Sequence, residues 1–222
     1  RDNEIKDIHP LITLNNLTSL QIQNNPILDF SSLGLLLSLE KLYLAGEEIN
    51  DISFLKDLIQ LKELSISGSP LNDISTLRNL TSLEELSLTR LALIDLGPLK
   101  NLNGLKKLDP QQNKISDLAP ITNLSHLTYL DLSDNQIIDL SPLNNLGELV
   151  SLSLSRNLIE DLTPLDGLNN LGNLTAYGNY IKKVKIKKGL KKLKWLDISE
   201  NQISKVYGLI YTPLLEELNL SK

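Results

Sequence analysis

The chain has 222 residues, a formal net charge of -5 and no cysteine. The missing thiols exclude disulfides, cysteine-based metal sites and a cysteine nucleophile, and the mild acidity argues against nucleic-acid binding over the whole chain. Apolar residues make up 41% of the sequence, but they never form the run of about 18 that a transmembrane helix requires. These features predict one globular domain or one repeat array.

Leucine recurs along the whole chain with a fixed step of 22 residues. Further apolar columns with the same step begin at Leu20, Ile22 and Ile27, and most units read LxxLxLxxNxIxDLxPLxxLxx. This periodicity predicts a single domain over residues 1–222, with about ten units and partial units at both ends. The first leucine column is Leu17, Leu39, Leu61, Leu83, Leu105, Leu127, Leu149, Leu171, Leu193 and Leu215.

The first half of each unit predicts a short strand. Leu130 and Leu132 alternate with outward residues, so stacked units are expected to form a parallel sheet with strands about 4.8 Å apart. An asparagine column follows, as at Asn135 and Asn157. Its amide is expected to hydrogen-bond backbone groups of its own turn and of the neighbouring turn.

The second half of each unit predicts a return segment on the opposite side. Apolar residues there lie three apart, which favours a helical or 3₁₀ conformation. Ser141 and Thr163 are expected to be N-caps, each followed by a proline in the first turn. Because strands and return segments differ in width, the array should curve into a solenoid with the strands on its concave side.

This layout resembles the leucine-rich repeat family, in the 22-residue class of bacterial internalin-like proteins and SDS22-like phosphatase regulators. Residues 127–149 and 149–171 carry the resemblance most clearly. It implies an α/β solenoid, a right-handed curved array with a concave parallel sheet, that binds another protein on its concave face. The DLxPL return segment is closer to internalin-like members, which are often secreted or at the cell surface. The alternative is an intracellular, cytoplasmic SDS22-like scaffold or regulatory subunit that docks an enzyme.

Both ends of the chain stop within a unit, and no polar capping module is visible. Terminal repeats of a solenoid expose an apolar face. We therefore expect the chain to be a fragment of a longer protein, or its array to be covered by a partner.

The repeat departs from its pattern in units two to four and in the strand that follows. Glu47, Ser69 and Leu91 replace the asparagine, and Pro110 replaces an inward leucine. We expect local irregularity there, because proline removes a backbone donor from the sheet. Drift within a tolerant repeat and a functional bend both explain it.

Aromatic residues are only 4% of the chain, yet three of them occupy outward strand positions in its second half. Rigid rings surrounded by small polar and acidic residues are typical of interface anchors. We therefore predict a partner-binding surface formed by Tyr129, Asp131, Tyr177, Trp195 and Asp197. Incidental surface aromatics are the alternative.

Residues 182–194 contain eight lysines, and Lys183 and Lys205 replace the aspartate of earlier units. Such a segment could hold an anionic polymer or lipid surface, with Lys187, Lys188, Lys191 and Lys192 as its candidate residues. The alternative is a solvated convex face, and the interleaved aromatics of a nucleic-acid reader are missing.

The sequence predicts no enzyme, no cofactor and no metal site. His9 and His126 lie five units apart, about 24 Å, and cannot share a metal. No glycine-rich phosphate loop or Ser-His-Asp grouping can be assembled.

Overall fold

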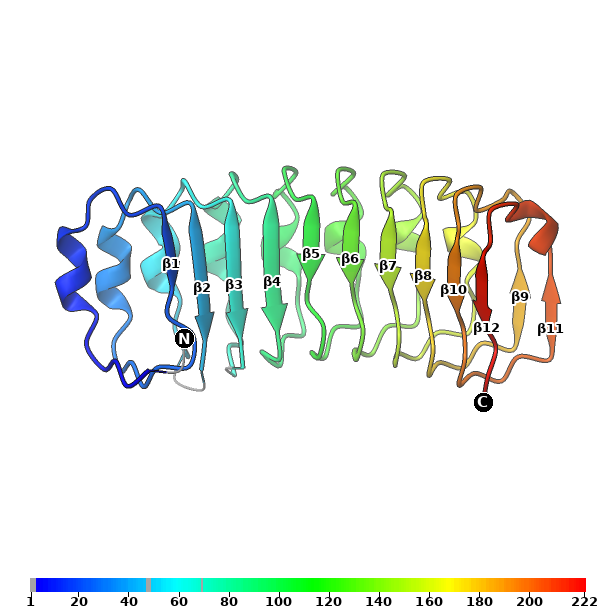
Figure 1. Cartoon of the computed structure of the whole chain (residues 1–222), viewed down its shortest axis with the longest axis horizontal. Coiled ribbons are helices and arrows are strands. Elements are labelled where there is room, and N and C mark those ends of the chain that lie inside the picture. The colour runs from blue at the N-terminus through cyan, green and yellow to red at the C-terminus, as the bar shows by residue number, and fades with distance from the viewer. Residues whose placement is uncertain (1–2, 47–48, 69) are drawn as a thin grey trace.

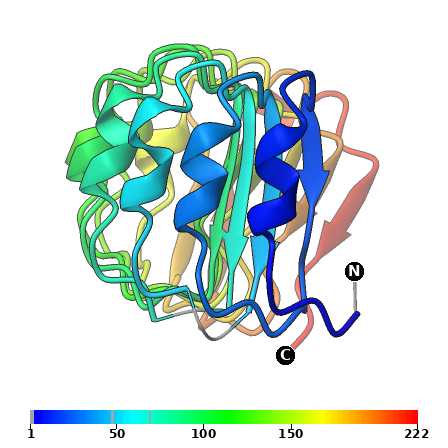
Figure 2. The ribbon, with the colours of Figure 1, turned by 90° about the vertical axis from the view of Figure 1, so that its left-hand side faces the viewer.

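The computed structural model describes residues 3–46, 49–68 and 70–222 and shows an elongated solenoid (Figure 1). Strands lie side by side along one side, and 3₁₀ turns cover the other (Figure 2). The main sheet is parallel throughout, and its strands follow chain order. They are β1 Ser19–Gln21, β2 Lys41–Ala45, β3 Glu63–Ser67, β4 Glu85–Thr89, β5 Lys107–Asp109, β6 Tyr129–Asp131, β7 Ser151–Ser153, β8 Asn173–Thr175, β10 Trp195–Asp197 and β12 Glu217–Asn219.

The leucine columns fill the interior between the sheet and the return segments. In the middle of the sheet Leu108, Leu130 and Leu152 are in register on β5, β6 and β7, and each is at most 1% exposed. Full burial of one leucine side chain stabilises the fold by about 1.5–3 kcal/mol. Because every unit adds such residues to the same stack, the core runs through the solenoid as predicted.

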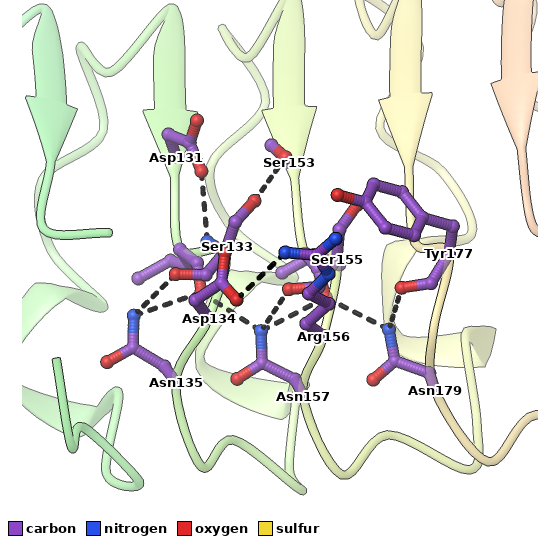
Figure 3. A network of polar contacts seen from close by, with 12 residues as sticks. Asp131, Ser133, Asp134, Asn135, Ser153, Ser155, Arg156, Asn157, Tyr177 and Asn179 are labelled. Carbon is purple, nitrogen blue, oxygen red and sulfur yellow. Dashed lines mark hydrogen bonds and ion pairs between the residues drawn. The ribbon is translucent and has the colours of Figure 1, made fainter. Parts of the chain in front are cut away.

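Buried asparagines tie successive turns together after the strands. Nδ2 of Asn157 donates to the carbonyl oxygens of Leu132, Leu154 and Ser155 at 2.9, 3.0 and 3.2 Å, and its Oδ1 accepts the Ile137 N–H at 3.0 Å. Figure 3 shows this ladder along three neighbouring turns. The predicted role of the asparagine column is therefore confirmed. The same pattern recurs at Asn113, Asn135, Asn179 and Asn201.

The return segments are 3₁₀ turns over most of the chain. They are η1 His9–Thr13, η2 Ser31–Leu35, η3 Ser53–Asp57, η4 Ser75–Asn79, η5 Gly97–Leu99, η6 Ala119–Ile121, η7 Ser141–Leu143, η8 Thr163–Leu165 and η9 Leu209–Tyr211. None of the described helices is long and apolar enough to cross a membrane.

In η1 to η8, an aspartate two residues before the first helical residue caps the turn. The Ser141 N–H and Oγ donate to the Asp139 carboxylate at 2.8 and 2.6 Å, and these bonds lower the pKa of Asp139. Asp161 accepts the same two bonds from Thr163. The prediction that Ser141 and Thr163 are N-caps was therefore wrong: each is the first residue of its turn and a donor to the aspartate.

The solenoid departs from the predicted return conformation near its C-terminal end. There β9 Lys183–Lys185 and β11 Lys205–Tyr207 pair in parallel and form a second, two-stranded sheet. Lysine replaces the capping aspartate in both segments, and Ile186 stands where Pro164 stands one unit earlier. With neither the cap nor the proline to fix a 3₁₀ turn, both segments are extended at their lysines, and a 3₁₀ turn, η9, forms only after β11.

The irregular region of units two to four keeps an unbroken sheet. Glu47 and Ser69 lie outside the described residues. Leu91, at the asparagine position, is fully buried, and its N–H donates to Oδ1 of Asn113 at 3.0 Å. Pro110 is also buried and follows the last residue of β5, where its carbonyl oxygen accepts bonds from Nδ2 of Asn113 and Asn135. The sheet therefore tolerates the proline, because it lies just beyond the strand.

Candidate protein-binding surface

The side chains between the buried leucines point away from the core. On β6 these are Tyr129 and Asp131, on either side of Leu130. Paired residues of neighbouring strands in register are 22 positions apart, so outward residues of one column form a row across the sheet. We call the surface formed by the outward residues of the main sheet the strand face.

Ion pairs cross the strand face between β2 and β5. Lys41 Nζ lies 2.5 Å from Glu63, and Lys107 Nζ lies 2.7 Å from Glu85. Tyr43 Oη also donates to Glu63, and the bonds from Lys41 and Tyr43 lower the pKa of Glu63. Partly exposed pairs of this kind contribute at most about 1 kcal/mol. Their main effect is to neutralise this part of the strand face.

A shallow hollow of about 190 Å³ lies over β2 to β6 on the same face. Tyr43 and Tyr129 lie on the first and last of these strands, and the small side chains of Ser65 and Ser87 lie between them. Aromatic rings over a floor of small residues leave room for an inserted side chain. The repeat pattern identifies Tyr129 as an outward residue, but it does not predict this hollow.

Carboxylates gather beside Tyr129. Burial raises the pKa of Asp109, and the Asp131 charge raises it further. Burial, followed by the charges of Asp131 and Asp109, raises the pKa of the Tyr129 phenol to about 12. Neither Asp109 nor Asp131 forms an ion pair with any residue that the structure describes. The centre of the strand face therefore carries negative charge without a cationic partner.

The predicted residue Tyr177 lies beyond the end of β8. The Arg156 guanidinium carbon lies 5.4 Å from the centroid of its ring, and Arg156 also pairs with Asp134 at 3.5 Å (Figure 3). A cation over the ring holds Tyr177 in place. One side of this ring is therefore already covered within the chain.

The predicted residues Trp195 and Asp197 lie together on β10. Trp195 is 39% exposed and is aligned with Asn173 on β8 and Glu217 on β12. Oδ1 of Asp197 accepts bonds from the Ser199 N–H and Oγ at 3.0 and 2.6 Å. Three strand spacings, about 15 Å, separate Trp195 from Tyr129.

Hydroxyl groups link the strands between these two aromatic residues. Ser153 Oγ lies 2.5 Å from Ser133 Oγ and accepts a bond from Thr175 Oγ1 at 2.8 Å. Ser155 lies below this surface: it is only 1% exposed, and its Oγ has no hydrogen-bond partner among the described residues. Small polar side chains therefore form the surface between Tyr129 and Trp195.

The structure spreads the predicted anion-binding lysines over several edges. Lys187 lies beside Lys183 and Lys185. The Lys187 and Lys188 N–H groups donate to the Asp166 carboxylate, which fixes the loop after β9. Lys191 is exposed on the next loop. On the same loop, Lys192 Nζ donates to Oδ1 of Asn170 at 2.8 Å.

The arrangement suits recognition of a surface. Within the described parts of the chain, no three histidine, cysteine or acidic residues are grouped as metal ligands. A shallow face that combines rings, hydroxyls and carboxylates offers contacts over a broad area, as protein interfaces do.

A ten-stranded parallel sheet, 3₁₀ returns and an asparagine ladder with a 22-residue period define a leucine-rich repeat solenoid, and this chain has that fold. No family model and no curated protein matches the chain. Solved structures of leucine-rich repeat proteins do resemble it.

Two of these structures are internalins from Listeria monocytogenes. The chain is 28% identical to an internalin, inlF, with a TM-score of 0.69, and 28% identical to internalin C2, with a TM-score of 0.66. In both cases the similarity covers 99% of this chain and 78% of the other.

The fold also matches the leucine-rich repeat ectodomain of a membrane receptor kinase from Arabidopsis thaliana, solved in complex with Casparian strip integrity factor 2. That match has a TM-score of 0.73 and 20% identity, and it covers 97% of this chain and 34% of the receptor chain. At this identity the match shows the fold alone.

Proposed function

We propose that this chain is a protein-recognition module whose partner binds the strand face between β2 and β10. One observation carries the proposal: the hollow, the half-buried ring of Tyr129 and the carboxylates of Asp109 and Asp131, which form no ion pair with a described residue, meet at the centre of that face. Trp195, Tyr177 and Asp197 extend the surface toward the C-terminal end.

The chemistry of this centre favours a basic segment of the partner. A lysine or arginine side chain beside Asp109 and Asp131 would relieve the repulsion between the two carboxylates. The rings of Tyr129 and Trp195 would contribute apolar contact area at low cost in side-chain entropy. A partner that spans both rings would cover about 15 Å of the sheet, which suits the central part of a standard interface.

The proposed setting is the ligand-binding repeat region of a bacterial secreted or surface protein of the internalin-like kind. Similarity to two internalins over 99% of the chain supports this setting. The alternative is an intracellular SDS22-like scaffold. The proposal includes no enzymatic activity, because the strand face offers binding groups without an arranged nucleophile and base.

Affinity capture with variants tests the proposal. The wild-type chain, the double variant Tyr129→Ala with Trp195→Ala, and the control Thr18→Ala would be immobilised in parallel, with folding checked by circular dichroism. The proposed partner is retained by wild type and by the control and is lost on the double variant. Equal retention of every captured protein on all three would contradict a role for the strand face.

A further inference from the structure

The two-stranded sheet of β9 and β11 carries lysines on its outer side. In β9, Lys183 and Lys185 are exposed and Val184 between them is 2% exposed. Strand β11 lies beside β9 (Figure 1), and its exposed Lys205 is the register partner of Lys183. Like charges directly opposite one another on neighbouring strands are destabilising.

These charges have no ion-pair partner in the part of the chain that the structure describes. Lys183, Lys185, Lys187 and Lys205 form no ion pair with any residue in the described ranges. By contrast, Lys182 pairs with Glu160 at 3.5 Å. The repulsion among the four lysines is therefore a cost that an external anion would remove.

A hollow of about 340 Å³ lies between these side chains. It is lined by Lys183, Lys185 and Lys187, together with Ile186 and Tyr207. Three of the four lysines therefore line a recess that is open to a ligand.

We propose that Lys183, Lys185, Lys187 and Lys205 bind a linear polyanion whose phosphate groups repeat along its chain. Lys183 and Lys185 are alternate residues of β9, about 6.6 Å apart along the strand, and Lys187 continues the series in the loop just beyond it. All four are lysines, which act as point charges and lack the planar fork with which arginine recognises a single anionic group. The surface therefore recognises repeated negative charge along a polymer and not a single anionic group.

The rest of the solenoid confines this ligand to the last units. The position taken by Lys183 and Lys205 is an aspartate in every earlier unit, so the same edge is acidic up to β9. Negative charge there repels a polyanion. The aspartates are Asp7, Asp29, Asp51, Asp73, Asp95, Asp117, Asp139 and Asp161.

Binding of long-chain inorganic polyphosphate at several salt concentrations tests the proposal. Wild type should bind at low salt, and the logarithm of its binding constant should fall with log salt at a slope of about -3, as four neutralised phosphates imply. The triple variant Lys183→Gln, Lys185→Gln, Lys205→Gln should bind at least about tenfold more weakly. The slope of its salt dependence should be no steeper than about -1. Its thermal unfolding midpoint should be equal to or above that of wild type.

Two further variants separate this surface from general charge. Replacing Lys6, Lys100 and Lys114 by Gln changes the net charge equally and should leave polyphosphate binding nearly intact. A variant with arginine at positions 183, 185 and 205 should still bind polyphosphate, because the positive charges are kept. Absent binding by wild type, or an equal loss in the control, would overturn the proposal.

The nature of the ligand is tested with two other probes. Tripolyphosphate should bind much more weakly than the long polymer. Equal affinity for tripolyphosphate and the long polymer would overturn the proposal that the ligand is a polymer. Binding to phosphatidylglycerol vesicles without binding to polyphosphate would overturn it too, and would assign the lysines to a membrane surface.

Discussion

Replacing Asn157 by alanine removes four hydrogen bonds from the middle of the asparagine ladder. The three carbonyl oxygens that Nδ2 reaches each keep another donor, namely Asn135, Asn179 or the Asp134 N–H. The Ile137 N–H, in contrast, loses the Oδ1 acceptor at a position that is fully buried. The main consequence is therefore one orphaned donor together with three lost bonds.

These losses have a predictable size. An unsatisfied buried N–H costs about 1–3 kcal/mol, and each lost hydrogen bond costs about 0.5–1.5 kcal/mol net. Because the bonds share one small region, we expect the free energy of unfolding to fall by about 3–5 kcal/mol. Asn157→Asp should cost at least as much at pH 7, since it loses the donors and places a charge beside carbonyl oxygens.

Urea unfolding followed by circular dichroism measures the effect. Asn145→Ala is the matched control, because Asn145 is exposed and its side chain is not part of the ladder. A loss below about 1 kcal/mol for Asn157→Ala, or equal losses for the two variants, would refute the reasoning.

Three other predictions follow from burial and charge. Leu130→Ala should lower the free energy of unfolding by about 2–5 kcal/mol, while Ser151→Ala on the outer side should have little effect; equal midpoints would reverse the assignment of inside and outside. Burial raises the pKa of Asp109, so Asp109→Asn should stabilise the fold at pH 7. This gain should shrink as the pH falls toward about 4, because the folded carboxyl with its raised pKa is protonated first, and it should vanish below about 4, where the carboxyl is protonated in the folded and unfolded states; a variant less stable than wild type at pH 7 would contradict it. One tyrosine should ionise near pH 12 in an ultraviolet titration, and Tyr129→Phe should remove that step; titration of every tyrosine near 10 would exclude it.

Much of the fold could be predicted from the columns of the repeat, because each column has one environment. Leu130 is buried and Tyr129 outward, as alternation along a strand requires. The capping group was misassigned at Ser141, because serine and aspartate both suit a turn, and only geometry shows that Asp139 accepts the bonds. The strand at β9 was missed because its lysines were read as surface charge rather than as the loss of a cap.

The candidate site could be predicted only in part. Outward position is a property of one column, so Tyr129 and Trp195 could be named. The hollow depends on Ser65 and Ser87 being small between two rings that are four units apart, and the orientation of those rings is not encoded in their spacing. Likewise, the hydroxyl of Ser153 joins a chain of hydroxyls across three strands or turns, which its outward position alone does not reveal.

The most direct test of the proposed function is a binding titration of the captured partner at two salt concentrations. Tyr129→Ala should weaken binding by about 2 kcal/mol or more, and Asp131→Ala should reduce the association rate and its salt dependence. Thr18→Ala, at the edge of β1, should bind like wild type. If Tyr129→Ala and Asp131→Ala both bind as tightly as Thr18→Ala while remaining folded, the centre of the strand face is not the recognition surface.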